Sequence, residues 1–342
     1  NGLRPARYCI TTDDRLIMAS EAGAIATDES IIIKKGRLQP GKMLMADLSE
    51  GMIYDDNQIK SIVCDNKPYT KWLKEQRIKL RLLPIPILQK KIINTHRLTT
   101  RQISNGMTEE DVKITILPFA RTGAEPLGSM GSDVPLAVLS KQSQHISNYF
   151  KQYFAQVSNP PIDPIRERLV MSLYTRIGKS LNLLKETAEH SRQVHISQPI
   201  LSRDDFYRIK GLTQYGMDYY IIDATLDVAN KETLRMAIGK ICNKAENAIN
   251  KGNSILIISN RKESKYKAAI PSLLATGSIH HHLVNKKLRT QAGIVVECSD
   301  AWETHHFATI IGYGASAIYP YLTYDTIQNA HDNNVLDNDQ PL

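Results

Sequence analysis

The chain has 342 residues, enough for two domains, and its 42% hydrophobic and 23% charged residues are those of a soluble globular protein. It contains no run of eighteen apolar residues, which excludes a predicted membrane-spanning helix. The net charge of +8 permits an acidic partner but does not require one, because no run of like charges appears.

The first 65 residues predict short strands joined by tight turns. Asp13-Asp14 is a hairpin turn between strands expected at 7–12 and 15–20, and two more strands are expected at 42–48 and 52–55. So few strands cannot close a core, so we expect an all-β piece of a larger domain. The chain also lacks an initiator Met, from which we expect it to begin inside a longer protein.

A basic segment with two prolines follows, from about 66 to 105, and we interpret it as a linker between domains. Nucleic-acid binding would need aromatic side chains among the basic ones as stacking platforms. Trp72 is the only aromatic residue in the stretch 71–101, so we do not expect that function.

Helix signals surround residues 108–117, and a glycine-rich loop follows them. Thr108 precedes three acidic residues, which favours a helix N-terminus, and Pro118 is expected to end the helix. The loop at 120–135 follows no strand with the spacing of a phosphate-binding fingerprint. A structural loop is therefore favoured over an anion site.

Two helices joined by a proline turn are predicted next. Between 146 and 157 apolar residues recur at the spacing of one buried helix face, and the Asn-Pro-Pro that follows ends the helix. Asp163 is a favoured N-cap and Pro164 a favoured first helical residue. A second helix is therefore expected over 165–177, ending at Gly178.

From Tyr219 onward, strand and helix patterns alternate. Four short apolar runs are typical of parallel strands buried on both faces, at 219–223, 254–259, 292–297 and 316–320. Helix-like stretches separate them, at 231–250, 269–286 and 303–311. We therefore predict an α/β fold with a βαβ series, right-handed crossovers and one parallel sheet.

Functional groups in such a sheet collect beyond the C-terminal strand ends. The residues at those ends are Asp223, Asn260, Arg261, Glu297 and Cys298. They are the candidates for ligand binding if this domain binds anything. An independent barrel enzyme using Asp223 and Glu297 is not expected, because a closed barrel needs about eight strands.

The histidines fall in two clusters, His280 to His282 and His305 with His306. Successive helical residues diverge by about 100°, so three adjacent histidines cannot face one metal ion. We favour ordinary hydrogen-bonded histidines over a metal site.

The four cysteines are far apart in sequence and form no C-x-x-C pair: Cys9, Cys64, Cys242 and Cys298. They indicate reduced thiols of an intracellular compartment, not a zinc or iron–sulfur site. Cys298 lies near His305 in sequence, and we interpret it as a small buried hydrophobic residue and not as a nucleophile. The adjacent pairs Asp13-Asp14 and Asp204-Asp205 diverge in space, so neither is expected to form an acid–base dyad.

Five stretches occur in the order in which one enzyme family has them. They are NGLRPARY at 1–8, EPLGSMGSDVPLAVLS at 125–140, NYFKQYFAQVSNPPIDPIR at 148–166, AIPSLLATGSIHHHLV at 269–284 and THHFATIIGYGASAIYPYL at 304–322. Together they resemble glutamate synthase, which makes glutamate from glutamine and 2-oxoglutarate. One departure is Asn260, where the family tends to have Asp, which puts a charge role at that position in doubt.

The resemblance implies three parts: the C-terminal strands of a class II glutamine amidotransferase domain at 1–75, a linker at 76–105, and the family's central domain at 106–342. The amidotransferase nucleophile would be an N-terminal cysteine, which this chain does not contain. Cys9 lies within an expected strand and cannot play that part. The resemblance therefore assigns no catalytic, cofactor-binding or metal-binding residue to this segment, and the isolated chain is expected to be inactive.

For the longer enzyme, the resemblance implies FMN and a three-iron four-sulfur cluster, with or without FAD, none of them in this segment. The segment would link the glutaminase and FMN sites and help to wall the passage for ammonia. Its partners would be the remaining domains of the same polypeptide, ferredoxin and the small molecules glutamine, 2-oxoglutarate and ammonia, without nucleic acid or membrane.

Two further features of the resemblance remain open. Reduced ferredoxin is favoured over NADPH as the electron donor, because the stretch 299–322 looks closer to the ferredoxin-dependent form. A plastid stroma, otherwise the cytoplasm, is the expected compartment, which the abundant Lys, Ile and Asn would suit. The alternative from another class is a free-standing α/β binding or scaffold protein.

Overall fold

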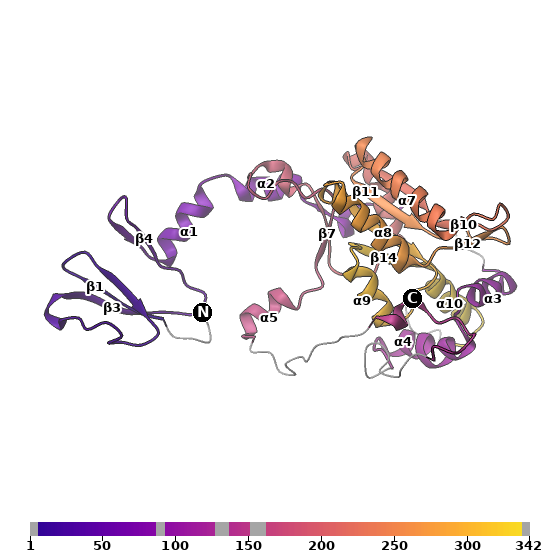
Figure 1. The fold of residues 1–342 in the computed structure, drawn as a ribbon, viewed down its shortest axis with the longest axis horizontal. Helices are drawn as coiled ribbons and strands as arrows, with labels where there is room; N and C mark the ends of the chain where they lie inside the picture. The colour runs from indigo at the N-terminus through magenta and orange to yellow at the C-terminus, as the bar shows by residue number, and fades with distance from the viewer. Residues whose placement is uncertain (1–5, 87–92, 127–136, 151–161, 337–342) are drawn as a thin grey trace. The chain divides into compact units, whose positions relative to one another are not determined.

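The computed structural model describes residues 6–86, 93–126, 137–150 and 162–336 (Figure 1). The chain forms two compact units, one of Asn1–Lys74 with Ala155–Ser172, the other of Glu75–Phe154 with Leu173–Leu342. Within the described ranges, no helix combines the length and the apolar character needed to cross a membrane.

The first unit contains the predicted hairpins. The strands β1 (Ala6–Thr11) and β2 (Leu16–Ala19) pair antiparallel, and β3 (Ile32–Leu38), which was not predicted, pairs with the other edge of β1. A second antiparallel pair joins β4 (Met45–Asp47) and β5 (Met52–Tyr54), as expected.

Helices also belong to this unit, so the all-β description of its first 65 residues needs correction. Helix α1 (Asp56–Asp65) begins at Asp55, whose side chain accepts from the backbone of Asn57 and Gln58, while the Gln58 side chain caps the backbone of Asp55. This capping box was present in the sequence as a signal of a helix start. Helix α2 (Tyr69–Gln76) follows.

Helix α5 (Pro164–Val170) begins as predicted and ends earlier than predicted. Asp163 caps it by accepting from the backbone of Ile165 and Arg166. The predicted continuation to 177 is wrong, because β7 (Thr175–Ile177) pairs antiparallel with β8 (Val194–Ile196). Pairing with a distant strand overrides the local helical pattern here.

The second unit is built on the predicted parallel sheet. Its strands are β9 (Tyr219–Asp223), β11 (Ile255–Ser259), β13 (Gly293–Cys298) and β14 (Ala317–Pro320), in the spatial order β14-β13-β11-β9. Every pair in this sheet is parallel. The βαβ prediction is therefore confirmed, and with it the α/β fold class.

Both faces of the sheet are buried, which explains the continuous apolar runs. On one face Leu256, Ile258 and Val296 pack with the crossover helices α7 (Leu234–Asn250), α8 (Ser272–Asn285) and α9 (Thr304–Gly312). In Figure 1, α7 and α8 lie side by side on this face. A short antiparallel pair joins β10 (Thr225–Asp227) and β12 (Lys267–Ala269).

On the other face, Ile255, Ile257 and Val295 pack with side chains from distant segments. These come from α3 (Thr95–Ser104), α6 (Arg203–Lys210), α10 (Tyr321–Asp332) and the small sheet in which β8 lies between β6 (Ile78–Lys79) and β7. Short 3-10 helices connect these elements, at Glu29–Ile31 in the first unit and at Leu80–Leu82, Ile146–Tyr149, Ala188–Ser191, Gly211–Tyr215 and Arg289–Gln291 in the second.

The segment 76–105 is more than a connector. Leu80 is 1% exposed and Leu98, on α3, is 6% exposed, and both belong to the core under the second face of the sheet. Leu80 and Leu98 thus contribute to a core, and the predicted division into 1–75, 76–105 and 106–342 stays a prediction.

The helix predicted to end at Pro118 continues beyond it. Thr108 and Asp111 cap each other's backbone as expected, and a π-helical segment, Asp111–Ile116, leads into α4 (Leu117–Thr122). Pro118 lies in the first turn of α4, where a missing N–H is tolerated. The helix ends instead at Gly123, whose φ of 67° suits glycine.

The long helix predicted from 146 to 157 is also corrected. Ile146–Tyr149 forms a single 3-10 turn, and the backbone of Phe150 is already extended. The rest of that prediction, with the Asn-Pro-Pro turn at 159–161, lies outside the described residues. So does most of the glycine-rich loop, at 127–136.

Candidate functional site

The parallel register brings the predicted strand-end residues to one edge of the sheet. Ser259, the last residue of β11, is level with Asp223 on β9 and with Glu297 on β13. Asn260 and Arg261 follow directly. Asp223 accepts from Thr225 at 2.7 Å, and its other oxygen lies 3.5 Å from the ammonium of Lys267.

Arg261 and Glu297 form a partly buried ion pair at this edge. The Arg261 Nε donates to one Glu297 oxygen at 2.6 Å, and the Ser259 hydroxyl donates to the other at 2.6 Å. The Glu297 side chain is 5% exposed. Burial works to lower the pKa of Arg261, but the Glu297 carboxylate outweighs it and the pKa is raised. Each oxygen of Glu297 therefore has a partner within the protein, and the carboxylate is held in this partly buried ion pair and not presented to solvent.

Two aromatic contacts position the cations around this pair. The guanidinium of Arg261 lies 4.0 Å from the ring centre of Tyr321, within the range of a cation–π contact. The ammonium of Lys210 lies 4.5 Å from the ring centre of Phe206. Burial lowers the pKa of Lys210, an effect that Glu297 opposes and Arg261 reinforces. These contacts indicate a fixed, packed cluster.

A second buried cluster lies at the start of α8. The Ser272 backbone and hydroxyl donate to the two oxygens of Asp300 at 2.8 and 2.5 Å. The Asn260 amide donates to the Ser272 hydroxyl at 3.3 Å, while its own oxygen is buried with no hydrogen-bond partner among the described residues. Asn260 is 1% exposed, so the neutral side chain avoids burying another charge beside Asp300.

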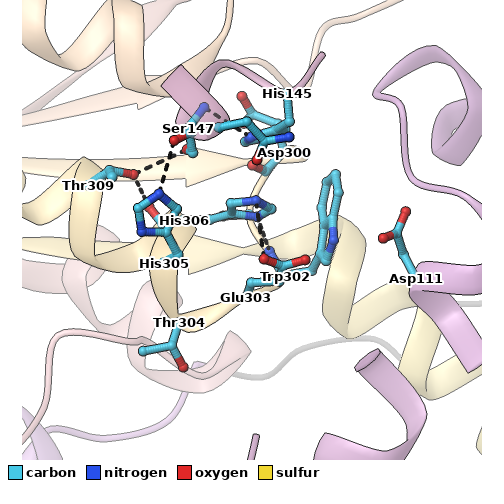
Figure 2. A network of polar contacts seen from close by, with 12 residues as sticks. Asp111, His145, Ser147, Asp300, Trp302, Glu303, Thr304, His305, His306 and Thr309 are labelled. Carbon is cyan, nitrogen blue, oxygen red and sulfur yellow. Dashed lines mark hydrogen bonds and ion pairs between the residues drawn. The ribbon is translucent and has the colours of Figure 1, made fainter. Parts of the chain in front are cut away.

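The histidines of α9 hold the 3-10 turn at Ile146–Tyr149 against that helix (Figure 2). The His305 Nε2 lies 2.9 Å from the Ser147 carbonyl, and the Ser147 and Thr309 hydroxyls are 3.2 Å apart. The ring of His306 stacks on that of His145, with 4.0 Å between the ring centres. The Nε2 of His145 lies 2.9 Å from the Asp300 carbonyl, which joins this network to the cluster at α8.

Burial changes the ionisation of this network. It lowers the pKa of His306 well below the usual value, and the nearby His145 and His305 add to the effect. Burial likewise raises the pKa of Glu303, with further contributions from Asp111 and Glu125. Figure 2 shows Glu303 and Asp111 on opposite sides of the Trp302 ring.

In the cluster at 280–282, two of the three histidines have polar partners. His280 accepts from Arg289 at 2.9 Å, and His282 lies 2.7 Å from a Glu246 oxygen. For these two residues the contacts agree with the hydrogen-bonded interpretation. Across the ranges that the structure describes, no group of three or more His, Cys, Asp or Glu side chains is arranged to hold a metal ion.

The candidate nucleophile and carboxylate pairs show no catalytic geometry. Cys298 is fully buried, and burial, reinforced by Asp300 and Glu297, raises the pKa of its thiol well above the usual value, so the thiol stays protonated at neutral pH. Asp205 pairs with Arg208 at 2.7 Å and Asp13 with Arg15 at 2.5 Å. Each of these carboxylates therefore serves a local ion pair.

Several residues of these clusters were not identified from the sequence: Arg101, Asn105, His145, Lys210, Ser272 and Asp300. Asp300 could have been found, because it follows the end of β13 by two residues. The others come from distant segments. For example, Asn105, just after α3, accepts from the Ser299 hydroxyl at 2.6 Å.

Comparisons with known proteins agree with the resemblance found in the sequence. Residues 100–341 match the family model of the glutamate synthase central domain, and residues 1–72 match that of class-II glutamine amidotransferases. The chain is 42% identical over 337 residues to the glutamate synthase [NADPH] large chain of Bacillus subtilis. It is 40% identical over 334 residues to the ferredoxin-dependent glutamate synthase of Cyanidium caldarium, and 39% identical over 328 residues to the chloroplastic ferredoxin-dependent glutamate synthase of Spinacia oleracea.

These three alignments cover 98%, 96% and 95% of this chain, and 22%, 21% and 20% of the respective relatives. The chain therefore spans about a fifth of the length of the curated relatives that it matches.

Proposed function

The chain belongs to the glutamate synthase family, and on that basis we propose that it is the connecting part of a glutamate synthase. In this role it links the domain that hydrolyses glutamine to the FMN-dependent site that makes glutamate from 2-oxoglutarate. The adjoining matches to an amidotransferase model and to the central-domain model support this placement.

The pairing of the strand-end groups is the structural observation that carries the proposal. Glu297 is bonded to Arg261 and Ser259, and Asp300 is bonded to the start of α8. Acid–base or nucleophilic catalysis needs a group that can reach the substrate and exchange a proton with it. Groups that satisfy one another instead support a framework that holds other sites in place.

We propose the remaining features of the function from the family. The segment helps to wall the passage through which ammonia reaches the synthase site. Reduced ferredoxin supplies the electrons, with NADPH as the alternative; the relatives named above include both types. The compartment is the plastid stroma, otherwise the cytoplasm, and the chloroplastic relative from Spinacia oleracea supports the first.

The cofactors of the full-length protein, FMN and a three-iron four-sulfur cluster, with or without FAD, are proposed to be held by residues other than these. An iron–sulfur cluster needs several cysteine thiolates converging on it. Within the second unit, Cys242 and Cys298 lie on different elements, and burial raises the pKa of the Cys298 thiol well above its usual value. Both observations support the proposal.

The proposal is tested by substituting the strand-end candidates in the full-length protein. We expect Cys298→Ala and Asp223→Asn to leave kcat for glutamine-dependent glutamate synthesis within about twofold of the unsubstituted protein, because neither group takes part in the chemistry. The assay is run with reduced ferredoxin and with NADPH in parallel, which also identifies the donor. Free ammonia is measured in the same reactions.

A loss of about a hundredfold or more in kcat for either folded variant would show that a catalytic group lies in this segment. If the unsubstituted protein makes no glutamate with either donor, the proposal that it is a glutamate synthase is contradicted. Circular dichroism of each variant distinguishes a lost catalytic group from a lost fold.

A further inference from the structure

A pocket with three arginines lies in the second unit, and it shares Arg261 with the strand-end cluster described above. Its volume is about 390 Å³, and its lining includes Ile93, Arg97, Leu98, Arg101, Arg261 and Asp325. Arg97 and Arg101 are one turn apart on α3, and Arg261 follows the carboxyl end of β11. Ligands in parallel α/β sheets gather beyond the carboxyl ends of the strands.

Arg261 is held rigidly at the wall of this pocket. Its Nε is bonded to Glu297 and its guanidinium lies over the ring of Tyr321. Arg101 donates to the backbone carbonyl of Arg261 at 3.3 Å, and the guanidinium groups of Arg101 and Arg261 lie 5.9 and 4.0 Å from the ring centre of Tyr321. A binding group fixed in this way before the ligand arrives loses little conformational freedom on binding.

The charges around the pocket are unbalanced in favour of an anion. Glu297 is engaged behind Arg261, and Asp325, on α10, is the acidic side chain among the lining residues, against three arginines. Adjacent guanidinium groups repel one another, and an anion between them removes that cost. The planar fork of arginine matches the two oxygens of a carboxylate or the oxygens of a phosphate.

We propose that this pocket binds a small organic anion through carboxylate or phosphate oxygens. Its volume lies within the range of small-molecule sites, roughly 300–1,000 Å³. Ile93 and Leu98 supply an apolar part of the wall, which suits a short carbon chain between charged groups. The ligand class is therefore a small dicarboxylate or a phosphorylated metabolite.

The test is amide hydrogen exchange of the full-length protein with and without a probe, which localises binding to α3. Glutarate is the dicarboxylate probe and inorganic phosphate the phosphate probe. Either one should slow exchange over Thr95–Ser104, and the one with the lower half-saturation identifies the ligand class. The variant R97Q/R101Q should raise that half-saturation at least tenfold, since about 1.4 kcal/mol is tenfold in affinity.

Arg235→Gln is the matched control for Arg97→Gln, because it removes one positive charge from an exposed position on α7 outside the pocket. It should leave the half-saturation unchanged. Arg97 is itself exposed, so Arg97→Gln alone provides a folded variant if the double variant is unstable. Arg261 is not substituted, because its loss would leave the buried Glu297 carboxylate without its cationic partner.

Two results would overturn the proposal. One is unchanged exchange of α3 with either probe at concentrations that saturate ordinary small-molecule sites. The other is a half-saturation that does not change in the double variant or in Arg97→Gln. That result would show that the anion binds elsewhere.

Discussion

His306 illustrates how one buried side chain makes stability depend on pH. It is 2% exposed and stacked on His145, and burial lowers its pKa well below the usual value. The folded protein therefore keeps this imidazole neutral, whereas the unfolded chain takes up a proton below a pH of about 6.5. The stability of the second unit should fall as the pH drops below that value, and His306 should contribute up to about 2 kcal/mol of the loss by pH 5.

We predict that His306→Gln flattens this pH dependence, even if it lowers stability at neutral pH by removing the ring stack. Urea unfolding measured at pH 7 and pH 5 gives the slope directly. His96→Gln removes an exposed imidazole on α3 and serves as the control. Burial also lowers the pKa of His195 and His280, so some pH dependence should remain in His306→Gln. A slope equal to that of the unsubstituted protein would mean that these other histidines, and not His306, cause the pH dependence.

Among the helices, α8 and α9 share an unusual start. The residues at their N-cap positions, Pro271 and Glu303, make no side-chain cap. Carboxylates from elsewhere in the chain replace it: Asp300 accepts from the backbone of Ser272, and Glu125 accepts from the backbone of Thr304 at 2.9 Å. A negative group at a helix N-terminus satisfies free N–H groups and complements the helix dipole.

We predict that Asp300→Ala destabilises the second unit by about 1–3 kcal/mol, because it leaves the Ser272 amide and hydroxyl buried without an acceptor. Urea unfolding measures the loss, and faster amide exchange in the first turn of α8 locates it. Asp300→Asn keeps one acceptor oxygen and should lose less. A change below about 0.5 kcal/mol in the alanine variant would mean that the cap contributes little.

These caps also mark the limit of what the sequence could predict about the elements. The parallel strands were predictable because their two buried faces require continuous apolar runs, and the start of α5 was predictable because Asp163 acts on its own neighbours. Thr175–Ile177 was not, since β8 converts it to a strand. The sequence therefore predicts the helices and strands that are determined by neighbouring residues, and not those that depend on pairing with another segment.

At the scale of the whole molecule, the same distinction applies to the candidate site. The order of strands and helices placed Asp223, Asn260, Arg261 and Glu297 at one edge of the sheet, as the registers confirm. Their partners could not be predicted: Arg101 lies 160 residues from Arg261 in sequence. A site assembled from distant segments becomes visible only when the fold brings them together.

The last prediction concerns the 342-residue chain by itself. We expect the purified chain to release no ammonia from glutamine and to show no visible flavin absorbance. Cys9 lies inside β1, paired with Ile17 on one side and Lys35 on the other, and its nitrogen is part of a peptide bond. It therefore lacks the free amine that would activate an N-terminal nucleophile. The full-length protein, assayed alongside, is the positive control, and glutamine hydrolysis by the pure 342-residue chain would place a nucleophile within it.

An immunoblot of the source cells with antibody against this chain completes the test, and we expect a band several times heavier than 38.5 kDa, because the chain spans only about a fifth of its relatives.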